Sequence, residues 1–177
     1  MKIHFKKLSQ TAIAPNKYHY NDSGFDLYAD EDVTLAYGET KAIATNIALE
    51  LPDGYMADVR PRSGLTRDTA LRVHYGTVDA GYRGGIGIIC ENASDEDARF
   101  SDAYAMAAAL ARVNKKDNEK ILVEKSNEYN EKSVIEIKRG DKIAQLVIQK
   151  IPDVQLVEAD ELNETVRGAD GFGSTGK

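Results

Sequence analysis

The last eleven residues carry side chains that can bind phosphate and one aromatic side chain that can stack on another ring. They lack the apolar pattern of a segment that folds into a helix or a strand. Residues 167–177 hold Arg167, Phe172, the hydroxyls of Ser174 and Thr175, and four glycines. Arginine offers paired N–H donors to an anion, and glycines let backbone N–H groups approach it. A segment that builds no core of its own is predicted to be a flexible arm that orders over a ligand. This chemistry points to a nucleotide.

Four more segments combine a glycine or proline bend with charged and hydroxyl side chains. They occupy residues 23–28, 60–65, 76–84 and 139–145. Any one of them alone is weak evidence, because ordinary surface turns use the same residue types. Together with the arm they make five candidate segments that span most of the chain.

The elements that must position these segments are short β-type runs separated by turn residues. Many short strands with glycine and proline breaks predict an all-β sandwich, barrel or jelly roll. The best strand candidates are residues 25–28, 40–47, 55–59, 85–90, 133–137 and 143–148.

One window departs from this β pattern. Phe100, Ala103, Ala107 and Leu110 recur at helical spacing in an alanine-rich stretch, which predicts one short helix between residues 98 and 113. Charged segments flank it, so residues from about 94 to 133 are expected to form a surface insertion. The chain is then one domain, residues 1–166, followed by the arm, residues 167–177.

Composition limits the function classes. A chain of 177 residues with 42% hydrophobic and 29% charged residues fits one globular domain. Its net charge of -6 argues against nucleic-acid binding, which needs a basic face, but a single anion needs only a local cationic cluster. The lone Cys90 excludes an internal disulfide and favours a reducing compartment. No stretch approaches the length of a membrane span, and we expect a cytoplasmic protein.

In chain order, the five segments resemble the five motifs of the trimeric dUTPase family, the deoxyuridine triphosphate nucleotidohydrolases. The resemblance implies an all-β jelly roll assembled as a homotrimer, with each active site at a subunit boundary and a C-terminal arm closing over it. It implies hydrolysis of dUTP to dUMP and pyrophosphate by water attack on the α-phosphorus, with Mg²⁺ on the triphosphate. This reaction keeps uracil out of DNA and supplies dUMP for dTMP synthesis. Residues 94–133 depart from the family, whose connection there is usually much shorter.

The resemblance assigns catalytic and nucleoside-binding roles. Asp79 matches the aspartate that positions and activates the attacking water, and Gln145 matches a side chain that contacts that water and the α-phosphate region. Tyr82 matches the tyrosine that packs against the deoxyribose and excludes a 2′-hydroxyl by shape. Residues 80–86, which include Gly85, match a β-hairpin whose backbone groups contact uracil. Arg83 is expected to support that hairpin from behind.

The triphosphate is expected to meet two groups of residues. Arg62, Ser63 and Gly64 match the second motif, in which Arg62 supplies charge or braces the site. On the arm, Phe172 matches the ring that covers uracil, and the expected substrate-binding residues there are Arg167, Phe172, Gly173, Ser174 and Thr175.

Two carboxylates complete the predicted site. Asp26 matches a carboxylate near the magnesium, reached through its water shell, as suits an ion that gives up water reluctantly. No histidine and cysteine cluster is present, so a zinc site is not expected. Asp141 is assigned to structural support, either by holding the site's arginines or as a turn residue.

Two alternatives stay open. The dCTP deaminases of the same superfamily are one, although they lack this arm. The other is a dUTP-gated regulatory protein that binds a partner such as a repressor through residues 94–133, by similarity to some phage dUTPases. The competing interpretation of the insertion is a neutral surface addition or an added contact in the trimer. A phage-encoded protein would act in the host cytoplasm.

Overall fold

The structure is a computed structural model that describes residues 1–94 and 134–169. This part of the chain is almost entirely β, as predicted, with one helix of six residues, α1. The elements are β1 His4–Lys7, β2 Phe25–Tyr28, β3 Val33–Leu35, β4 Thr40–Ala44, β5 Ile47–Glu50, β6 Tyr55–Arg60, α1 Ser63–Asp68, β7 Leu71–Val73, β8 Gly76–Val78, β9 Gly87–Asn92, β10 Ile135–Ile137 and β11 Lys142–Lys150.

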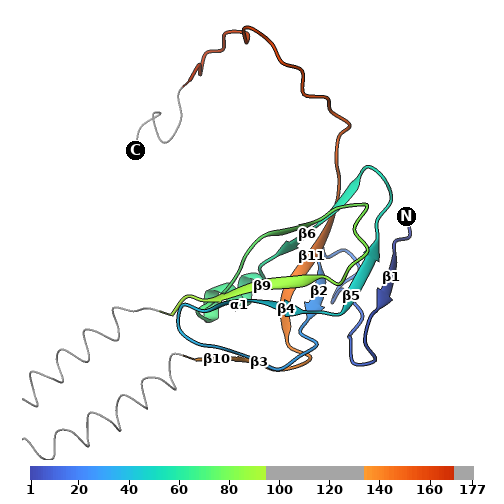
Figure 1. Ribbon diagram of the computed structural model, residues 1–177, viewed down its shortest axis with the longest axis vertical. Helices are drawn as coiled ribbons and strands as arrows, with labels where there is room; N and C mark the ends of the chain where they lie inside the picture. Colours follow the sequence, from blue (N-terminus) through green and yellow to red (C-terminus); the bar gives the residue numbers. More distant parts are fainter. Residues whose placement is uncertain (95–133, 170–177) are drawn as a thin grey trace, which may run out of the picture.

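Two antiparallel sheets form the body. The larger has the strand order β2-β11-β6-β8 and the smaller has the order β4-β9-β7, while β1 pairs with β5 and β10 with β3. In Figure 1, β4 and β9 cross β11. The antiparallel pairs join segments that are far apart in the sequence, because β11 lies between β2 and β6.

The hydrophobic core draws on both sheets and therefore lies between them. In β9, Ile88 and Cys90 are fully buried while Ile89 between them is exposed. This alternation is what a strand with one face on the core requires. Leu27 of β2 and Leu146 of β11 come from the opposite sheet and join the same cluster. Burying each such side chain contributes about 1.5–3 kcal/mol.

The predicted strand 40–47 is two strands, so that prediction is wrong in detail. The break falls at Thr45 and Asn46. Asn46 has a φ of 50°, a left-handed conformation that asparagine tolerates better than most residues. The buried Thr45 hydroxyl donates to the carbonyl of Ile86 at 2.8 Å. The turn sends β5 away from β4 to pair with β1.

The segment 80–86 is not a hairpin between paired strands. β8 pairs with β6 in the larger sheet, whereas β9 pairs with β4 and β7 in the smaller one. The turn therefore crosses from one sheet to the other. The short strands β1, β3, β7 and β8 and the helix α1 were also not predicted.

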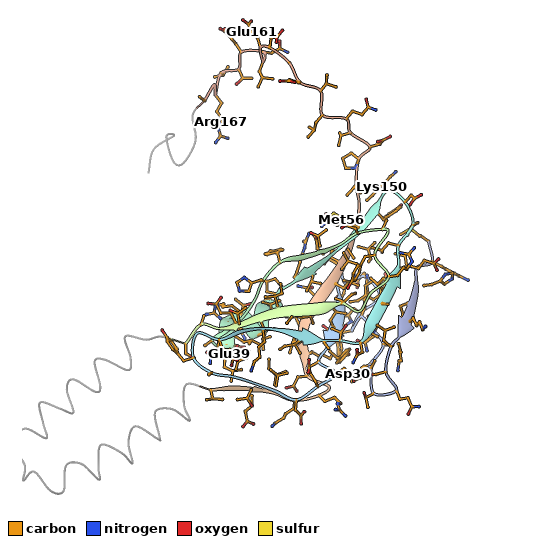
Figure 2. All side chains as sticks on the ribbon, in the orientation of Figure 1. Asp30, Glu39, Met56, Lys150, Glu161 and Arg167 are labelled. Atoms are coloured by element: carbon orange, nitrogen blue, oxygen red, sulfur yellow. The ribbon has the colours of Figure 1, made fainter. Side chains whose placement is uncertain are left out.

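Beyond β11 the chain leaves the body. The amide of Ile151 still donates to the carbonyl of Gly54 at 2.9 Å, but residues 152–169 are exposed throughout. Figure 2 places Glu161 and Arg167 on this arm, far outside the body. The arm thus begins near residue 151, whereas the sequence placed the boundary at 166.

The predicted helix at 98–113 and the insertion around it lie outside the described residues. Within the described residues, no helix is long and apolar enough to cross a membrane.

Candidate active site in two cavities

The larger cavity collects residues from three of the five candidate segments. It has a volume of about 630 Å³ and lies beside the row in which β2, β11 and β6 meet, where Gln145 is paired with Asp26 on one side and Arg60 on the other. The predicted residues that line it are Asp26, Arg62, Ser63, Gly64 and Gln145, together with Lys142, which the sequence did not single out. We call this the large cavity.

A β-bulge in β11 decides which side chains face the large cavity. In a regular strand, residues three positions apart point to opposite faces. The register of β11 against β2 shifts between Lys142 and Ala144, and both Ile143 and Ala144 are buried. Lys142 and Gln145 therefore share the face of the cavity. Bulges re-aim side chains in this way next to active sites.

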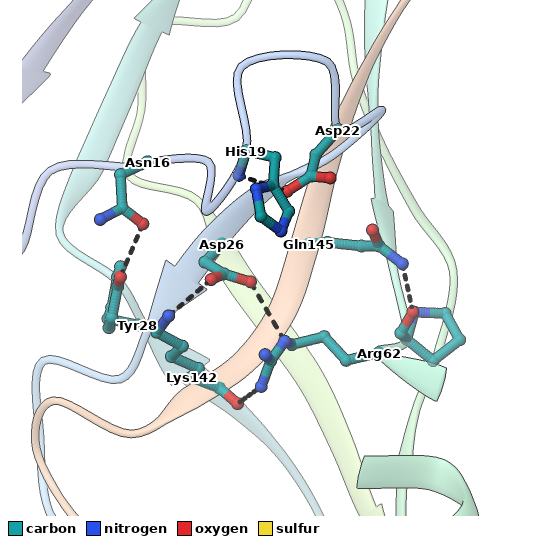
Figure 3. Close-up of polar contacts among 9 residues, drawn as sticks. Asn16, His19, Asp22, Asp26, Tyr28, Arg62, Lys142 and Gln145 are labelled. Atoms are coloured by element: carbon teal, nitrogen blue, oxygen red, sulfur yellow. Dashed lines mark hydrogen bonds and ion pairs between the residues drawn. The ribbon is translucent and has the colours of Figure 1, made fainter. Parts of the chain in front are cut away.

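Asp26 lies between two cations on the wall of the large cavity (Figure 3). Its Oδ1 is 3.1 Å from Nε of Arg62, and its Oδ2 is 2.8 Å from Nζ of Lys142. Arg62 also donates from Nη1 to the carbonyl oxygen of Lys142 at 3.0 Å. Arg62 is thus held at two points, on Asp26 and on the backbone of residue 142. The hydrogen bond to Asp26 raises the pKa of Lys142.

Gln145 is held against the second motif. Its Nε2 donates to the carbonyl of Pro61 at 2.9 Å. Its side chain fills the space over Gly24, where a Cβ atom would come within 2.4 Å of Oε1 of Gln145. Glycine at position 24 is what lets the amide lie there. The first, second and fourth candidate segments are therefore in direct contact at this point.

A smaller cavity of about 210 Å³ contains the third segment, and we call it the small cavity. Asp79, Tyr82 and Gly85 line it. The turn is closed by a hydrogen bond from the Tyr82 amide to the Asp79 carbonyl at 3.1 Å. The Tyr82 hydroxyl donates to the Gly85 carbonyl at 3.0 Å. The tyrosine ring is thereby tied to the backbone that was predicted to contact uracil.

The two residues predicted to give support each hold a turn. Arg83 donates from Nη1 to the carbonyls of Ala80 and Tyr82 at 2.6 and 2.9 Å. The carboxylate of Asp141 accepts the amide N–H of Lys138 at 2.8 Å, so Asp141 holds the 138–141 turn. This hydrogen bond is compatible with the role of a turn residue, and the predicted role in holding the site's arginines stays a prediction.

Strand register separates the two cavities within one chain. Val78 pairs with Ala57 of β6, three residues from Arg60, which pairs with Gln145. At about 3.4 Å per residue, Asp79 lies about 10–13 Å from Gln145 along the strands, and two strand spacings add about 10 Å across them. One chain therefore does not bring its Asp79 to its own Gln145.

The remaining predicted site residues lie on the arm. Arg167 is described and exposed, whereas Phe172, Gly173, Ser174 and Thr175 lie outside the described residues. In the described part of the chain, no three histidine, cysteine, aspartate or glutamate side chains gather where they could hold a metal ion.

Several residues that line the large cavity were missed by sequence reasoning: Tyr18, Asp22, Asp68, Thr69 and Lys142. Lys142 is the one among them that carries a positive charge. It stands three positions before Gln145, and parity in a regular strand puts it on the opposite face. The signal that could have found it is the stretch from 142 to 146, where two adjacent apolar residues interrupt the alternation.

Comparisons with known proteins agree on one family. A family model described as dUTPase matches residues 10–127 and 129–176. The deoxyuridine 5'-triphosphate nucleotidohydrolase of Gloeothece citriformis is 37% identical, with 99% of this chain and 97% of that protein covered. The enzyme of the same name from Nautilia profundicola is 36% identical, with both chains covered completely.

The similarity to solved structures also indicates the dUTPase family. The dUTPase of Staphylococcus bacteriophage 80alpha with dUPNHPP superposes with a TM-score of 0.76 at 27% identity, and 99% of each chain is covered. Phage dUTPases such as that of bacteriophage 80alpha control transfer of virulence genes by a proto-oncogenic G protein-like mechanism.

Proposed function

The chain belongs to the dUTPase family, and on that premise we propose that it hydrolyses dUTP to dUMP and pyrophosphate by magnesium-assisted attack of water on the α-phosphorus. The observation that carries the proposal is the convergence of three separate segments on the large cavity. Arg62, Ser63 and Gln145 there supply a positive charge, a hydroxyl and an amide. These are the groups that bind phosphate oxygens.

The small cavity supplies the nucleoside side of the proposed site. The ring of Tyr82 is tied to the Gly85 carbonyl, and packed against a deoxyribose it would leave no space for a 2′-hydroxyl and so would exclude UTP by a clash. Backbone donors and acceptors of residues 80–86 would pair with uracil, and the wrong base would leave buried polar groups unpaired. Asp79 lies exposed at the start of this turn, where it can hold and polarise a water molecule.

The two cavities belong to one site only if different chains contribute them. Asp79 and Gln145 would both act at the α-phosphorus, yet the strand register keeps them well over 10 Å apart in one chain. A cyclic trimer has head-to-tail contacts, which place different surfaces of neighbouring chains side by side. We therefore propose that the large cavity of one chain faces the small cavity of its neighbour.

The exposed arm supports the same assembly. Leu156, Val157, Leu162 and Val166 are each more than four-fifths exposed in the isolated chain. Apolar side chains in such a row are normally covered by a partner surface. An arm that crosses a neighbouring copy would cover them and bring residues 167–175 over that neighbour's nucleotide. Closure would exclude water and strengthen the charge contacts.

Magnesium fits this site as an ion carried by the triphosphate. Both oxygens of Asp26 are already paired with cations, so a direct metal bond would compete with Arg62 and Lys142. Contact through the ion's water shell leaves both ion pairs in place, as suits Mg²⁺. When bound, the ion would neutralise charge that develops on the phosphates.

Pyrophosphate release tests the proposed reaction. We expect dUTP to react well, and dCTP, dTTP and UTP to react poorly, with turnover that depends on magnesium. Asp79→Asn should lower turnover by about 10²–10⁴-fold while nucleotide binding is largely kept. Asp53→Asn, an exposed turn aspartate outside both cavities, is the matched control. Near wild-type turnover by Asp79→Asn would contradict the role of Asp79.

Mixed trimers test the shared site. Asp79→Asn and Gln145→Ala should each lose most of their turnover alone while keeping a measurable residual rate. In co-assembled trimers, a site is intact when its Asp79 and its Gln145 both come from unmutated positions of neighbouring chains. Random mixing in equal amounts makes about one site in four intact, so about a quarter of the wild-type activity should return. No recovery in verified mixed trimers would contradict the shared site.

A further inference from the structure

We propose that Lys142 is a further phosphate-binding residue of the large cavity, and that Asp26 is the residue that positions it. The proposal rests on the proposed function, because the phosphates are those of the nucleotide that this cavity takes. The ligand chemistry is an oligophosphate chain.

Lys142 lies on the wall of the large cavity. The bulge between Lys142 and Ala144 turns Lys142 onto the face that carries Gln145. The lysine lines the large cavity beside Arg62 and Ser63. Its side chain keeps 38% of its surface exposed, and the Asp26 carboxylate that it pairs with is 16% exposed. The charged end of the lysine is therefore held at the cavity wall and remains reachable by a ligand.

The two cations of the cluster have N–H donors that their protein contacts do not use. An ammonium group has three N–H donors, and Lys142 uses one of them on Asp26 at 2.8 Å. The guanidinium of Arg62 has five N–H donors, and its contacts with Asp26 and with the carbonyl of Lys142 engage two of them. Both cations of this cluster therefore keep donors for phosphate oxygens, and the ammonium of Lys142 can turn its remaining donors toward them because its stem is flexible. The hydrogen bond to Asp26 raises the pKa of Lys142.

Asp26 reduces the repulsion between the two cations and orients Lys142. Lys142 and Arg62 carry like charges on the same wall, and they would repel each other without the carboxylate between them. Asp26 forms an ion pair with each (Figure 3). Its charge leaves the cluster with a net charge of +1 and fixes the direction of the lysine. A flexible lysine that is held in advance loses less entropy when it binds.

The decisive experiment measures binding without chemistry. Lys142→Met should weaken binding of a non-hydrolysable imido analogue of dUTP roughly tenfold or more in EDTA, measured by calorimetry. Inorganic tripolyphosphate, used as a competitor of the analogue, should weaken in parallel. Lys142→Arg should retain most of the affinity. Lys138→Met is the matched control, because Lys138 pairs with Glu136 at 3.1 Å and lines neither cavity.

A double-mutant cycle tests the positioning role of Asp26. Asp26→Asn should weaken analogue binding several-fold when Lys142 is present. In the Lys142→Met background the same change should cost little, because Arg62 keeps its second anchor on the backbone of residue 142. Equal losses in both backgrounds would overturn the positioning role. Thermal unfolding of each variant shows whether the fold is intact.

Failure of this inference is distinguishable from failure of the proposed function. If the wild-type chain does not release pyrophosphate from dUTP, the proposed function fails. If the wild-type chain is active and Lys142→Met binds the analogue as well as Lys138→Met does, Lys142 is a structural ion-pair residue and the inference is overturned.

Discussion

Gly24→Ala should disable the site through a neighbouring side chain while the fold stays intact. The backbone at Gly24 has an ordinary φ, so alanine is allowed there. The added Cβ would lie 2.4 Å from Oε1 of Gln145, whereas ordinary contacts begin at 3.4 Å. The amide of Gln145 must therefore move by about 1 Å, away from the place where it would contact the α-phosphate.

The magnitude follows from that displacement. A shift of about 1 Å in a catalytic group can cost about 10²-fold in rate, which is about 2.7 kcal/mol of transition-state stabilisation. The clash with Oε1 costs little folding free energy, because that oxygen is the far end of a flexible side chain. The Cβ atom of Gln145, which would lie 3.0 Å away, must also shift by a few tenths of an ångström, and this shift adds a modest cost. The loss of a glycine also restricts the unfolded chain, which offsets strain by about 0.4–1 kcal/mol. We expect Tm to change by less than about 4 °C.

The assay is steady-state pyrophosphate release by wild type, Gly24→Ala, Gln145→Ala and the double variant, with Tm measured for each. If Gly24→Ala acts through Gln145, it should cost about 10²-fold alone and much less when Gln145 is already alanine. Full activity of Gly24→Ala, or the same loss in both backgrounds, would refute the reasoning.

Three other changes have defined outcomes. In Gly84→Ala the new Cβ would lie 2.4 Å from the Tyr82 hydroxyl, so the ring must move and the kcat/KM ratio of dUTP over UTP should fall roughly tenfold or more. Burial raises the pKa of Cys90 to about 12, so iodoacetamide at about pH 8 should label it only after unfolding in urea. Burial acts to raise the pKa of Asp30, but hydrogen bonds, including one from Asn46 at 2.7 Å, outweigh it and lower the pKa. Its carboxylate therefore stabilises the fold at neutral pH, and this contribution is lost as the pH falls below about 4. Asp30→Asn should cost about 1–3 kcal/mol of unfolding free energy at about pH 7, and urea titrations at about pH 3 should show a smaller difference.

The sequence was sufficient for the fold class and for the segments that form the cavities. Short β-type runs between glycine, proline and aspartate turns identified most of the longer strands, because such residues end a strand. Segment 25–28 was predicted with the bounds of β2. Glycines in the bends marked the places where a backbone or a side chain approaches closely, as Gln145 does at Gly24.

The sequence was insufficient where a single residue redirects the chain. Residues 40–47 were predicted as one strand because the two polar residues Thr45 and Asn46 make only a short break, and the left-handed backbone of Asn46 is what divides the run. Strand partners were equally hidden, because β8 and β9 follow each other along the chain and yet pair in different sheets. Pairing depends on contacts between residues far apart in sequence, which local propensity does not encode.

The bulge in β11 is a local irregularity that decides which side chains face the large cavity. Without it, Lys142 would lie on the core side, where an unpaired ammonium is too costly to bury, or β11 would slip by one residue and turn Gln145 away from the cavity. One extra residue in the ladder lets Ile143 and Ala144 both enter the core while Lys142 and Gln145 both face the large cavity. The same irregularity thus packs the core and gathers the cations, which explains how a chain with a net charge of -6 keeps a positive cluster where an oligophosphate would bind.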